Sequence, residues 1–300
     1  MNRIRLGVLL QACRPRQWTK NLLVFAAPLF SSQLDDWSVW LDSFVAMVCF
    51  CLISSSIYLL NDVLDLKVDR KHRFKRFRPI ASGILPVKQA LFTSVLISSV
   101  SLTLASLISF KLTGLILIYA LIQVAYCLRL KHEPLLDLFC IASGFLLRAM
   151  AGDVYISPWF LLTVSLLALF LAVEKRKAEL KLFQESGVST RMVLARYSFP
   201  LLFRLESLLS TSAFISYALW ASGPSLNGAS TSWMLLTLPF VLVGIFRYQL
   251  LSDPDENERR SLMYPNRSSE NPEEILLGDR GIRFTLLGWF FVTLMVGAFT

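Results

Sequence analysis

The sequence has little charge, few histidines and no cysteine pattern, and each shortage excludes a class of protein. Charged residues make up 17% of the 300 residues and hydrophobic residues 55%, a balance unlike that of an ordinary soluble domain. No Ser-His-Asp or Cys-His arrangement can be placed around the two histidines, His72 and His132. The five cysteines lack metal-type spacing and are interpreted as small, reduced packing residues. A catalytic triad and a histidine–cysteine metal centre are therefore excluded.

What the sequence has in abundance is apolar runs separated by short polar breaks. A membrane-spanning helix needs about 20 mostly apolar residues, or about 17 at the short end. One run is weaker than the others, because its apolar part is short and contains Pro28. The predicted spans cover residues 17–32, 39–61, 87–110, 112–128, 135–152, 157–173, 198–221, 232–250 and 282–299. The expected fold is all-α, a polytopic membrane protein with nine transmembrane helices in a single domain over residues 1–300.

The distribution of basic residues supports the weak first span and sets the orientation. Lysine and arginine accumulate in cytoplasmic segments. Nine spans with the N-terminus inside place 28 of the 30 basic residues on that side. We therefore predict a cytoplasmic N-terminus and an outside C-terminus. The net charge of +9 then reflects topology and contact with anionic membrane phospholipids, and it requires no nucleic-acid partner.

An acidic segment follows the second predicted span at the cytoplasmic face. If that helix continues, Asp62, Asp65 and Asp69 lie at i, i+3 and i+7 on one face, where three carboxylates repel one another unless a cation lies among them. Oxygen-only ligands favour Mg²⁺, which substrate phosphates complete. The basic run from Lys67 to Arg78 suits such a Mg²⁺–phosphate complex. We predict that the three aspartates are metal ligands and catalytic; the alternative is a solvated helix end paired with basic neighbours.

These residues resemble the signature of the UbiA superfamily of intramembrane transferases. The family motif N-D-x-x-D-x-x-x-D is matched by Asn61, Asp62, Asp65 and Asp69, and the basic-loop motif R-P-[IL]-x-S-G is matched by residues 78–83. The resemblance implies a bundle of nine helices around a central cavity. It also implies that the acidic motif binds the Mg²⁺–diphosphate of a substrate.

The segment after the sixth predicted span departs from the family pattern. Typical members carry a second aspartate-rich motif there, whereas this chain has Lys175, Arg176 and Lys177 between Glu174 and Glu179. Three added cations suit an anion better than they suit a second metal ion. For Lys177 alone, the alternative is that it merely flanks the span on the cytoplasmic side.

Further segments resemble one branch of that superfamily, the polyprenyl-phosphate phosphoribosyltransferases. They are residues 14–21, 126–131, 144–152, 175–180 and 272–279. The resemblance implies transfer of phosphoribose from phosphoribosyl diphosphate to a polyprenyl (decaprenyl-type) phosphate, with Mg²⁺, at the cytoplasmic face of a bacterial inner membrane. The attacking lipid phosphate is already ionised, so no general base is needed. The predicted substrate-binding residues are Lys20, Asn21, Asn61, Arg78, Tyr126, Lys131, Arg148, Lys175, Arg176 and Glu179.

Arg148 lies inside a predicted span, where a charge costs at least about 2.5 kcal/mol at the bilayer centre. Such a residue lines a cavity or forms a buried pair, but Arg148 could also extend to the outer interface or pair with Asp153. The sequence alone does not distinguish between these interpretations of Arg148.

Two other functions stay open at this point. A UbiA-type prenyltransferase, which moves a prenyl group from a prenyl diphosphate to an aromatic or quinone precursor, requires the same fold. A non-enzymatic carrier of lipid-linked intermediates is disfavoured, because the charged groups gather at one face rather than at mid-membrane. No pattern sets the oligomeric state, and a homo-oligomer is left open.

Overall fold

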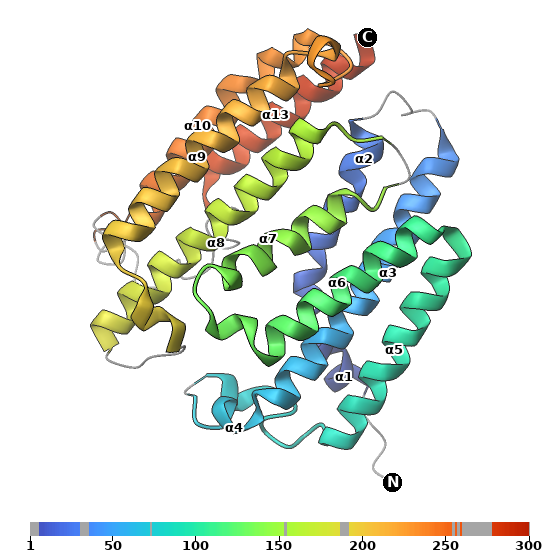
Figure 1. Ribbon diagram of the computed structural model, residues 1–300, viewed down its shortest axis with the longest axis vertical. Coiled ribbons are helices and arrows are strands. Elements are labelled where there is room, and N and C mark those ends of the chain that lie inside the picture. Colours follow the sequence, from blue (N-terminus) through green and yellow to red (C-terminus); the bar gives the residue numbers. More distant parts are fainter. Residues whose placement is uncertain are drawn as a thin grey trace. The chain divides into compact units, whose positions relative to one another are not determined.

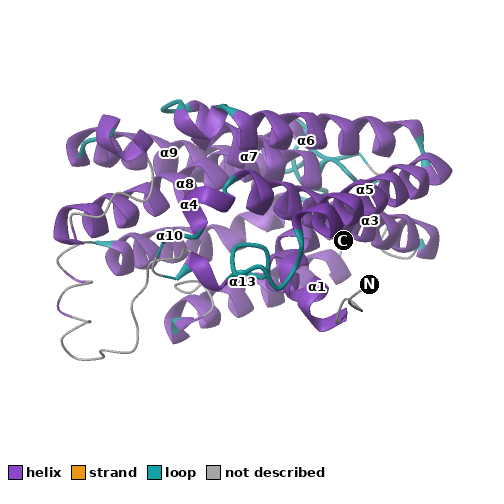
Figure 2. Ribbon diagram, turned by 90° about the horizontal axis from the view of Figure 1, so that it is seen from below, coloured by secondary structure: helices purple, strands orange, loops and turns teal. Residues whose placement is uncertain are grey.

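The fold is all-α, as predicted. The computed structural model describes residues 6–30, 36–72, 74–152, 155–186, 192–253, 256, 259 and 278–299. Within these ranges, helices and loops are present and strands are not (Figure 2). The chain divides into two compact units. The N-terminal unit comprises Met1–Lys131 and Ser143–Tyr155, and the C-terminal unit comprises His132–Ala142 and Ile156–Thr300.

Helix α3 (Trp37–Leu64) organises the N-terminal unit. It begins after Asp36, whose side chain accepts a hydrogen bond from the Ser38 amide at 2.9 Å and so caps the helix. Figure 1 shows α3 among its neighbours in this unit. These are α1 (Leu6–Cys13), the 3₁₀ helix η1 (Pro15–Phe25), α5 (Val87–Ile108) and α6 (Phe110–Leu128).

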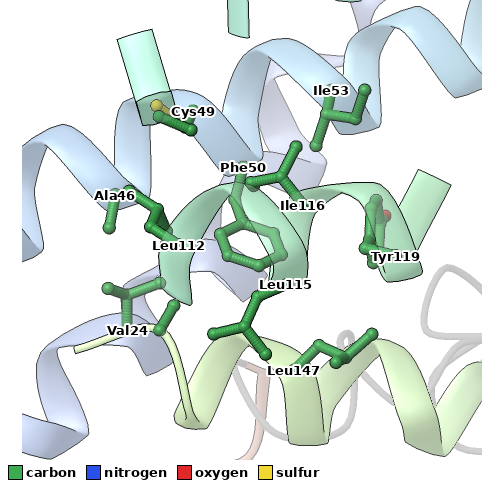
Figure 3. Close-up of a cluster of buried hydrophobic side chains, with 12 residues drawn as sticks. Val24, Ala46, Cys49, Phe50, Ile53, Leu112, Leu115, Ile116, Tyr119 and Leu147 are labelled. Carbon is green, nitrogen blue, oxygen red and sulfur yellow. The ribbon is translucent and has the colours of Figure 1, made fainter. Parts of the chain in front are cut away.

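Small side chains and an apolar cluster hold these helices together. Ser101 Oγ donates to the Cys49 carbonyl oxygen at 2.8 Å, and α3 and α5 are joined again by the Ser56 and Ser94 hydroxyls, 2.9 Å apart. Small residues that hydrogen-bond across helices are typical of contacts within membranes. Phe50 of α3 packs edge-on against the Tyr119 ring of α6, with centroids 5.5 Å apart, inside the apolar cluster of Figure 3.

The C-terminal unit is built on four long helices. Helix α8 (Pro158–Ser186) packs against α9 (Phe199–Ala221), and α10 (Leu238–Ser252) packs against α9 and α13 (Arg280–Phe299). The short 3₁₀ helix η6 (Ser232–Thr237) leads into α10. Arg247 binds the two carboxylate oxygens of Asp279 at 2.6 and 3.1 Å, which fixes the start of α13 against α10.

Among the described residues, six helices are long and apolar enough to cross a bilayer, and the chain is an integral membrane protein. The first of them is followed by a tight turn, so that the acidic motif lies at its end. Three of the six belong to each unit. They are Trp37–Leu64, Val87–Ile108, Phe110–Leu128, Pro158–Lys181, Ser232–Ser252 and Arg280–Gly297.

The other three predicted spans have shorter or more polar counterparts. Helix α7 (Leu136–Ala149) has 14 residues, and α9 contains Arg204 and Glu206. The weak first span is not an α-helix over most of its length: it forms η1, followed by the four-residue α2 (Ala26–Leu29). Pro28 explains the break between η1 and α2, because it lacks the backbone donor that a continuous α-helix would bond to the Val24 carbonyl.

Candidate active site

The acidic motif lies where α3 ends, and the chain turns within it. Asn61 and Asp62 occupy the last turn of α3, Asp65 caps it, and Asp69 closes the short helix α4 (Leu66–Asp69). The Asp65 amide bonds the Asn61 carbonyl at 2.9 Å and the Asp69 amide bonds the Asp65 carbonyl at 2.8 Å. The prediction of one continuous helix is therefore wrong at Asp65, although the turn keeps helix-like hydrogen bonds.

The break gives the three aspartates different surroundings. Asp62 and Asp69 are buried, at 3% and 2% exposure, whereas the Asp65 side chain is 30% exposed. Arg78 Nη1 donates to Asp62 Oδ1 at 3.1 Å and to Asp69 Oδ2 at 2.6 Å. A single cationic nitrogen thus bridges two of the three predicted metal ligands.

The loop that carries Arg78 is shaped by the rest of the R-P-I-A-S-G segment. The Ser82 hydroxyl and amide both bond the Arg78 carbonyl oxygen at 2.9 Å. Gly83 has φ +81°, a left-handed conformation that favours glycine. Ile80 is buried beside Leu59 of α3. These contacts place the guanidinium over the acidic motif.

Arg14 is a second guanidinium at Asp62, and the sequence analysis did not single it out. Its Nη2 forms an ion pair with Asp62 Oδ1, and its guanidinium lies 4.9 Å from the centre of the Tyr58 ring. Arg14 adopts the left-handed conformation, φ 54° and ψ 62°, directly before Pro15. One signal was available: Arg14 and Arg78 both precede a proline in a basic segment.

Lys131 is a third cation at the motif. Its Nζ lies 2.6 Å from Asp65 Oδ1 and 3.4 Å from Asn61 Oδ1. Asp65 is therefore paired with a different cation from the one that bridges Asp62 and Asp69. Within the described part of the chain, no group of three or more His, Cys, Asp or Glu side chains is close enough together to hold a metal ion.

The residues nevertheless fit a divalent cation chemically. The donors are carboxylate oxygens, with an amide oxygen at Asn61, and hard oxygen donors are what Mg²⁺ prefers. The position of Arg78 Nη1 shows that one positive centre can be shared by Asp62 and Asp69. The structure thus brings together two of the three predicted ligands, while Asp65 faces Lys131.

Arg148 and Asn21 form a separate buried network in the N-terminal unit. Arg148 donates to Asn21 Oδ1 at 2.6 Å, to the Gly144 carbonyl at 2.6 Å and to the Tyr119 hydroxyl at 3.0 Å. Its guanidinium also faces the rings of Phe50, Tyr119 and Phe145. Arg148 is buried rather than extended to the interface. Its suggested partner Asp153 lies outside the described residues.

Two further predicted substrate-binding residues of this unit, Lys20 and Tyr126, lie close in sequence to residues of the Arg148 network. Lys20 directly precedes Asn21 in η1, and Tyr126 lies near the C-terminal end of α6. Most of the predicted segment 272–279 lies outside the described residues.

In the C-terminal unit, Arg176 pairs both with Glu179 and with Asp137, a carboxylate that the sequence analysis missed. Arg176 is fully buried, donates from Nε to Asp137 Oδ2 at 2.7 Å and pairs through Nη1 with Glu179. The Tyr197 hydroxyl donates to Asp137 Oδ1 at 2.8 Å and accepts from the Leu135 amide at 2.8 Å. Burial raises the pKa of Tyr197 above its ordinary value.

One available signal for Asp137 was its position at the start of a predicted span, where a carboxylate is costly without a partner. The structure commits Arg176 to this internal network. Lys175, its neighbour in α8, is less buried.

Lys177 takes part in a different buried cluster, with Glu174 and Glu206. Its exposure is 3%. Lys177 is therefore held in buried ion pairs rather than in solvent, and whether it also flanks a span on the cytoplasmic side stays a prediction.

The fold and the motif define a class: integral membrane proteins in which an aspartate-rich helix end is covered by basic side chains. The chain belongs to the UbiA prenyltransferase family, whose model matches residues 22–269. The predicted family and the prediction of a membrane-bound transferase are thereby confirmed.

Individual relatives and solved structures extend the likeness along the chain. Decaprenyl-phosphate phosphoribosyltransferase from Mycolicibacterium smegmatis is 37% identical over 296 residues, which cover 94% of this chain and 89% of the relative. The protein of the same name from Corynebacterium glutamicum is 34% identical, over 96% of this chain and 86% of its own. A UbiA homolog from Archaeoglobus fulgidus, bound to GPP and Mg²⁺, has a TM-score of 0.67 at 16% identity, over 97% of this chain and 99% of its own.

Proposed function

We propose that this protein transfers the 5-phosphoribosyl group of phosphoribosyl diphosphate to a polyprenyl phosphate of the decaprenyl type, with release of diphosphate. The observation that carries the proposal is the near full-length likeness to two relatives named decaprenyl-phosphate phosphoribosyltransferase. A second observation supports the proposal independently: α8 carries Lys175, Arg176 and Lys177 where typical family members carry a second acidic motif. Cations suit the proposed reaction because both of its substrates are anions.

We propose Mg²⁺ as the cofactor, held by Asp62 and Asp69 with Asp65. The oxygen donor set and the shared cation position between Asp62 and Asp69 support this assignment, as does the Mg²⁺ in a UbiA structure of the same fold. When bound, Mg²⁺ would neutralise the negative charge that develops on the leaving diphosphate.

The chain's own basic residues have roles that follow from their positions. Arg14 and Arg78 meet at Asp62, and Lys131 meets Asp65. A guanidinium can bind phosphate oxygens as well as carboxylates, so these residues can exchange a carboxylate for a diphosphate oxygen when substrate enters. Lys20, Asn21, Asn61, Tyr126, Arg148, Lys175, Arg176 and Glu179 remain the other proposed substrate-binding or positioning residues.

The proposed acceptor, the lipid phosphate, needs no general base to remove a proton. A phosphate monoester of a lipid is ionised at neutral pH, and its oxygen can attack the anomeric carbon as the bond to diphosphate breaks. Charge at that carbon is oxocarbenium-like, as in glycosyl transfer. No histidine is required, and neither His72 nor His132 is needed as a base.

We further propose nine membrane passages around a central cavity, with the active site and the N-terminus in the cytoplasm, the C-terminus outside, and residence in a bacterial inner membrane. The positions of the basic residues support this orientation. The counterparts of the three additional passages are η1 with α2, α7 and α9.

The experiment uses the purified full-length protein in nanodiscs with radiolabelled phosphoribosyl diphosphate, decaprenyl phosphate and Mg²⁺. The expected result is a labelled lipid that requires both substrates and disappears when Mg²⁺ is chelated. A parallel reaction contains a prenyl diphosphate and an aromatic acceptor. Prenylation of that acceptor without any labelled lipid would assign the chain to the prenyltransferase alternative, which the structures bound to GPP and DMAPP exemplify.

A further inference from the structure

A buried charge cluster joins helices α8 and α9 of the C-terminal unit, and the proposed transfer reaction does not use it. This Glu–Lys–Glu cluster consists of Glu174 and Lys177 of α8 and Glu206 of α9. Lys177 Nζ lies 3.1 and 3.3 Å from the two Glu174 carboxylate oxygens and 2.5 Å from Glu206 Oε2. The three residues are 2%, 3% and 7% exposed, so water does not screen their charges.

The charges of this cluster do not balance. Two ionised carboxylates and one ammonium group leave one excess negative charge. Isolated charge is costly in a buried site within a membrane protein and is normally neutralised by a partner or by a proton. The Phe203 ring, whose centre lies 4.7 Å from Lys177 Nζ, is uncharged and adds no positive charge to the cluster.

Tyr248 of α10 supplies an independent sign that the cluster holds something further. The residue is 3% exposed, and its hydroxyl makes no hydrogen bond within the described residues. Glu174 and Glu206 are the charged groups that act on this hydroxyl. A buried hydroxyl rarely lacks a partner, and this one lies within the electrostatic reach of the two carboxylates of the cluster.

The groups around the cluster limit what the occupant can be. Helix α8 contributes Glu174 and Lys177, α9 contributes Glu206, and α10 contributes Tyr248 and the Ser252 side chain, which hydrogen-bonds Glu174. The Lys177 ammonium already lies between the two carboxylates. A metal ion would have to displace it, whereas a proton adds to a carboxylate oxygen and needs no further space.

We propose that the Glu–Lys–Glu cluster is a proton-binding site that holds one proton, shared between Glu174 and Glu206. The bound proton makes the cluster electrically neutral. It also turns one carboxylate into a donor for which the Tyr248 oxygen is an acceptor, directly or through one water molecule. At high pH the proton leaves to bulk water, the excess negative charge returns, and the packing of α8, α9 and α10 weakens.

The test compares the full-length wild type with Glu174→Gln and Glu206→Gln in detergent, by thermal unfolding over a range of pH. Glutamine resembles a protonated carboxyl group, so each single variant should keep a Tm within about 4 °C of the wild type at neutral pH. Wild-type Tm should fall as pH rises, and each single variant should lose this fall. The double variant leaves Lys177 without a carboxylate and should unfold on the order of 10 °C lower.

Infrared difference spectra between neutral and high pH supply a readout that does not depend on stability. The wild type should lose a protonated-carboxyl C=O band at high pH, and both single variants should lack that change. Glu133→Gln is the matched control, because Glu133 is a more exposed glutamate of the same unit, 3.8 Å from Arg196. It should behave like the wild type.

Two results would overturn the proposal. One is that both single variants keep the wild-type infrared change and pH dependence. The other is that, at fixed pH, Na⁺ or K⁺ raises the Tm of the wild type but not of the single variants, which would identify the occupant as a metal ion.

Discussion

Lys131 and Asp65 form an ion pair of 2.6 Å between positions 66 residues apart. The pair joins the segment after α6 to the turn at which α3 ends. Asp65 is the most exposed of the three motif aspartates and has Lys131 as its cation, while Arg78 bridges Asp62 and Asp69. The motif is therefore two linked charge groups at one helix end, and each can be tested separately.

Asp65→Asn should remove activity without preventing insertion. The side chain is 30% exposed, so asparagine is accommodated, but a metal ligand and the partner of Lys131 are lost. A metal ion supplies several kcal/mol of transition-state stabilisation, so transfer should fall by at least about 100-fold, measured with labelled phosphoribosyl diphosphate. Asp36→Asn, at the exposed N-cap of α3, is the control and should retain activity. Normal turnover in Asp65→Asn would refute the metal assignment.

Removing Arg78 should make the thermal stability of the protein depend more strongly on Mg²⁺ than it does in the wild type. In Arg78→Ala, Asp62 and Asp69 lose the nitrogen that bridges them, and a divalent cation no longer competes with it for the same two carboxylates. A ligand that binds only the folded state raises Tm according to its concentration and affinity. Thermal unfolding with increasing Mg²⁺ should therefore show a larger Tm increase in Arg78→Ala than in the wild type. Equal increases would place the metal elsewhere.

Gly83→Ala tests the loop that carries Arg78. A Cβ at Gly83 meets nothing within 4 Å, so the cost comes from φ +81° alone, about 1–2 kcal/mol for a left-handed residue with a side chain. The expected result is a lower Tm with reduced activity. Gly114→Ala is the matched control, because it also adds a Cβ in open space, but inside α6, where alanine is favoured by up to about 1 kcal/mol. Opposite Tm shifts are expected.

The sequence was sufficient for features that depend on local pattern, and insufficient for contacts that depend on the fold. Apolar runs located the long helices, and the spacing of Asp62, Asp65 and Asp69 marked the acidic end of α3. Arg14 meets Asp62 across 48 positions and Arg176 meets Asp137 across 39. No periodicity relates such distant residues. The first span was misjudged as an ordinary helix because hydropathy does not register the 3₁₀ backbone of η1.

The two neighbouring cations of α8 should have different roles. Arg176 is fully buried between Asp137 and Glu179, so Arg176→Ala leaves two buried or half-buried carboxylates without their cation and should destabilise the protein by about 3–5 kcal/mol. Arg176→Lys keeps the charge but not the planar fork, and it should recover part of that loss.

Lys175, which is less buried than Arg176, is the better candidate for contact with an anionic substrate. Lys175→Ala should raise KM for one anionic substrate by about 10-fold or more, the value of a charged hydrogen bond, with Tm unchanged. Thermal unfolding and steady-state kinetics on the three variants separate the roles. The assignments are reversed if Arg176→Ala keeps its Tm and raises KM while Lys175→Ala changes neither quantity. In that case the buried ion pair between Arg176 and Asp137 is not what holds the first turns of α7 to α8.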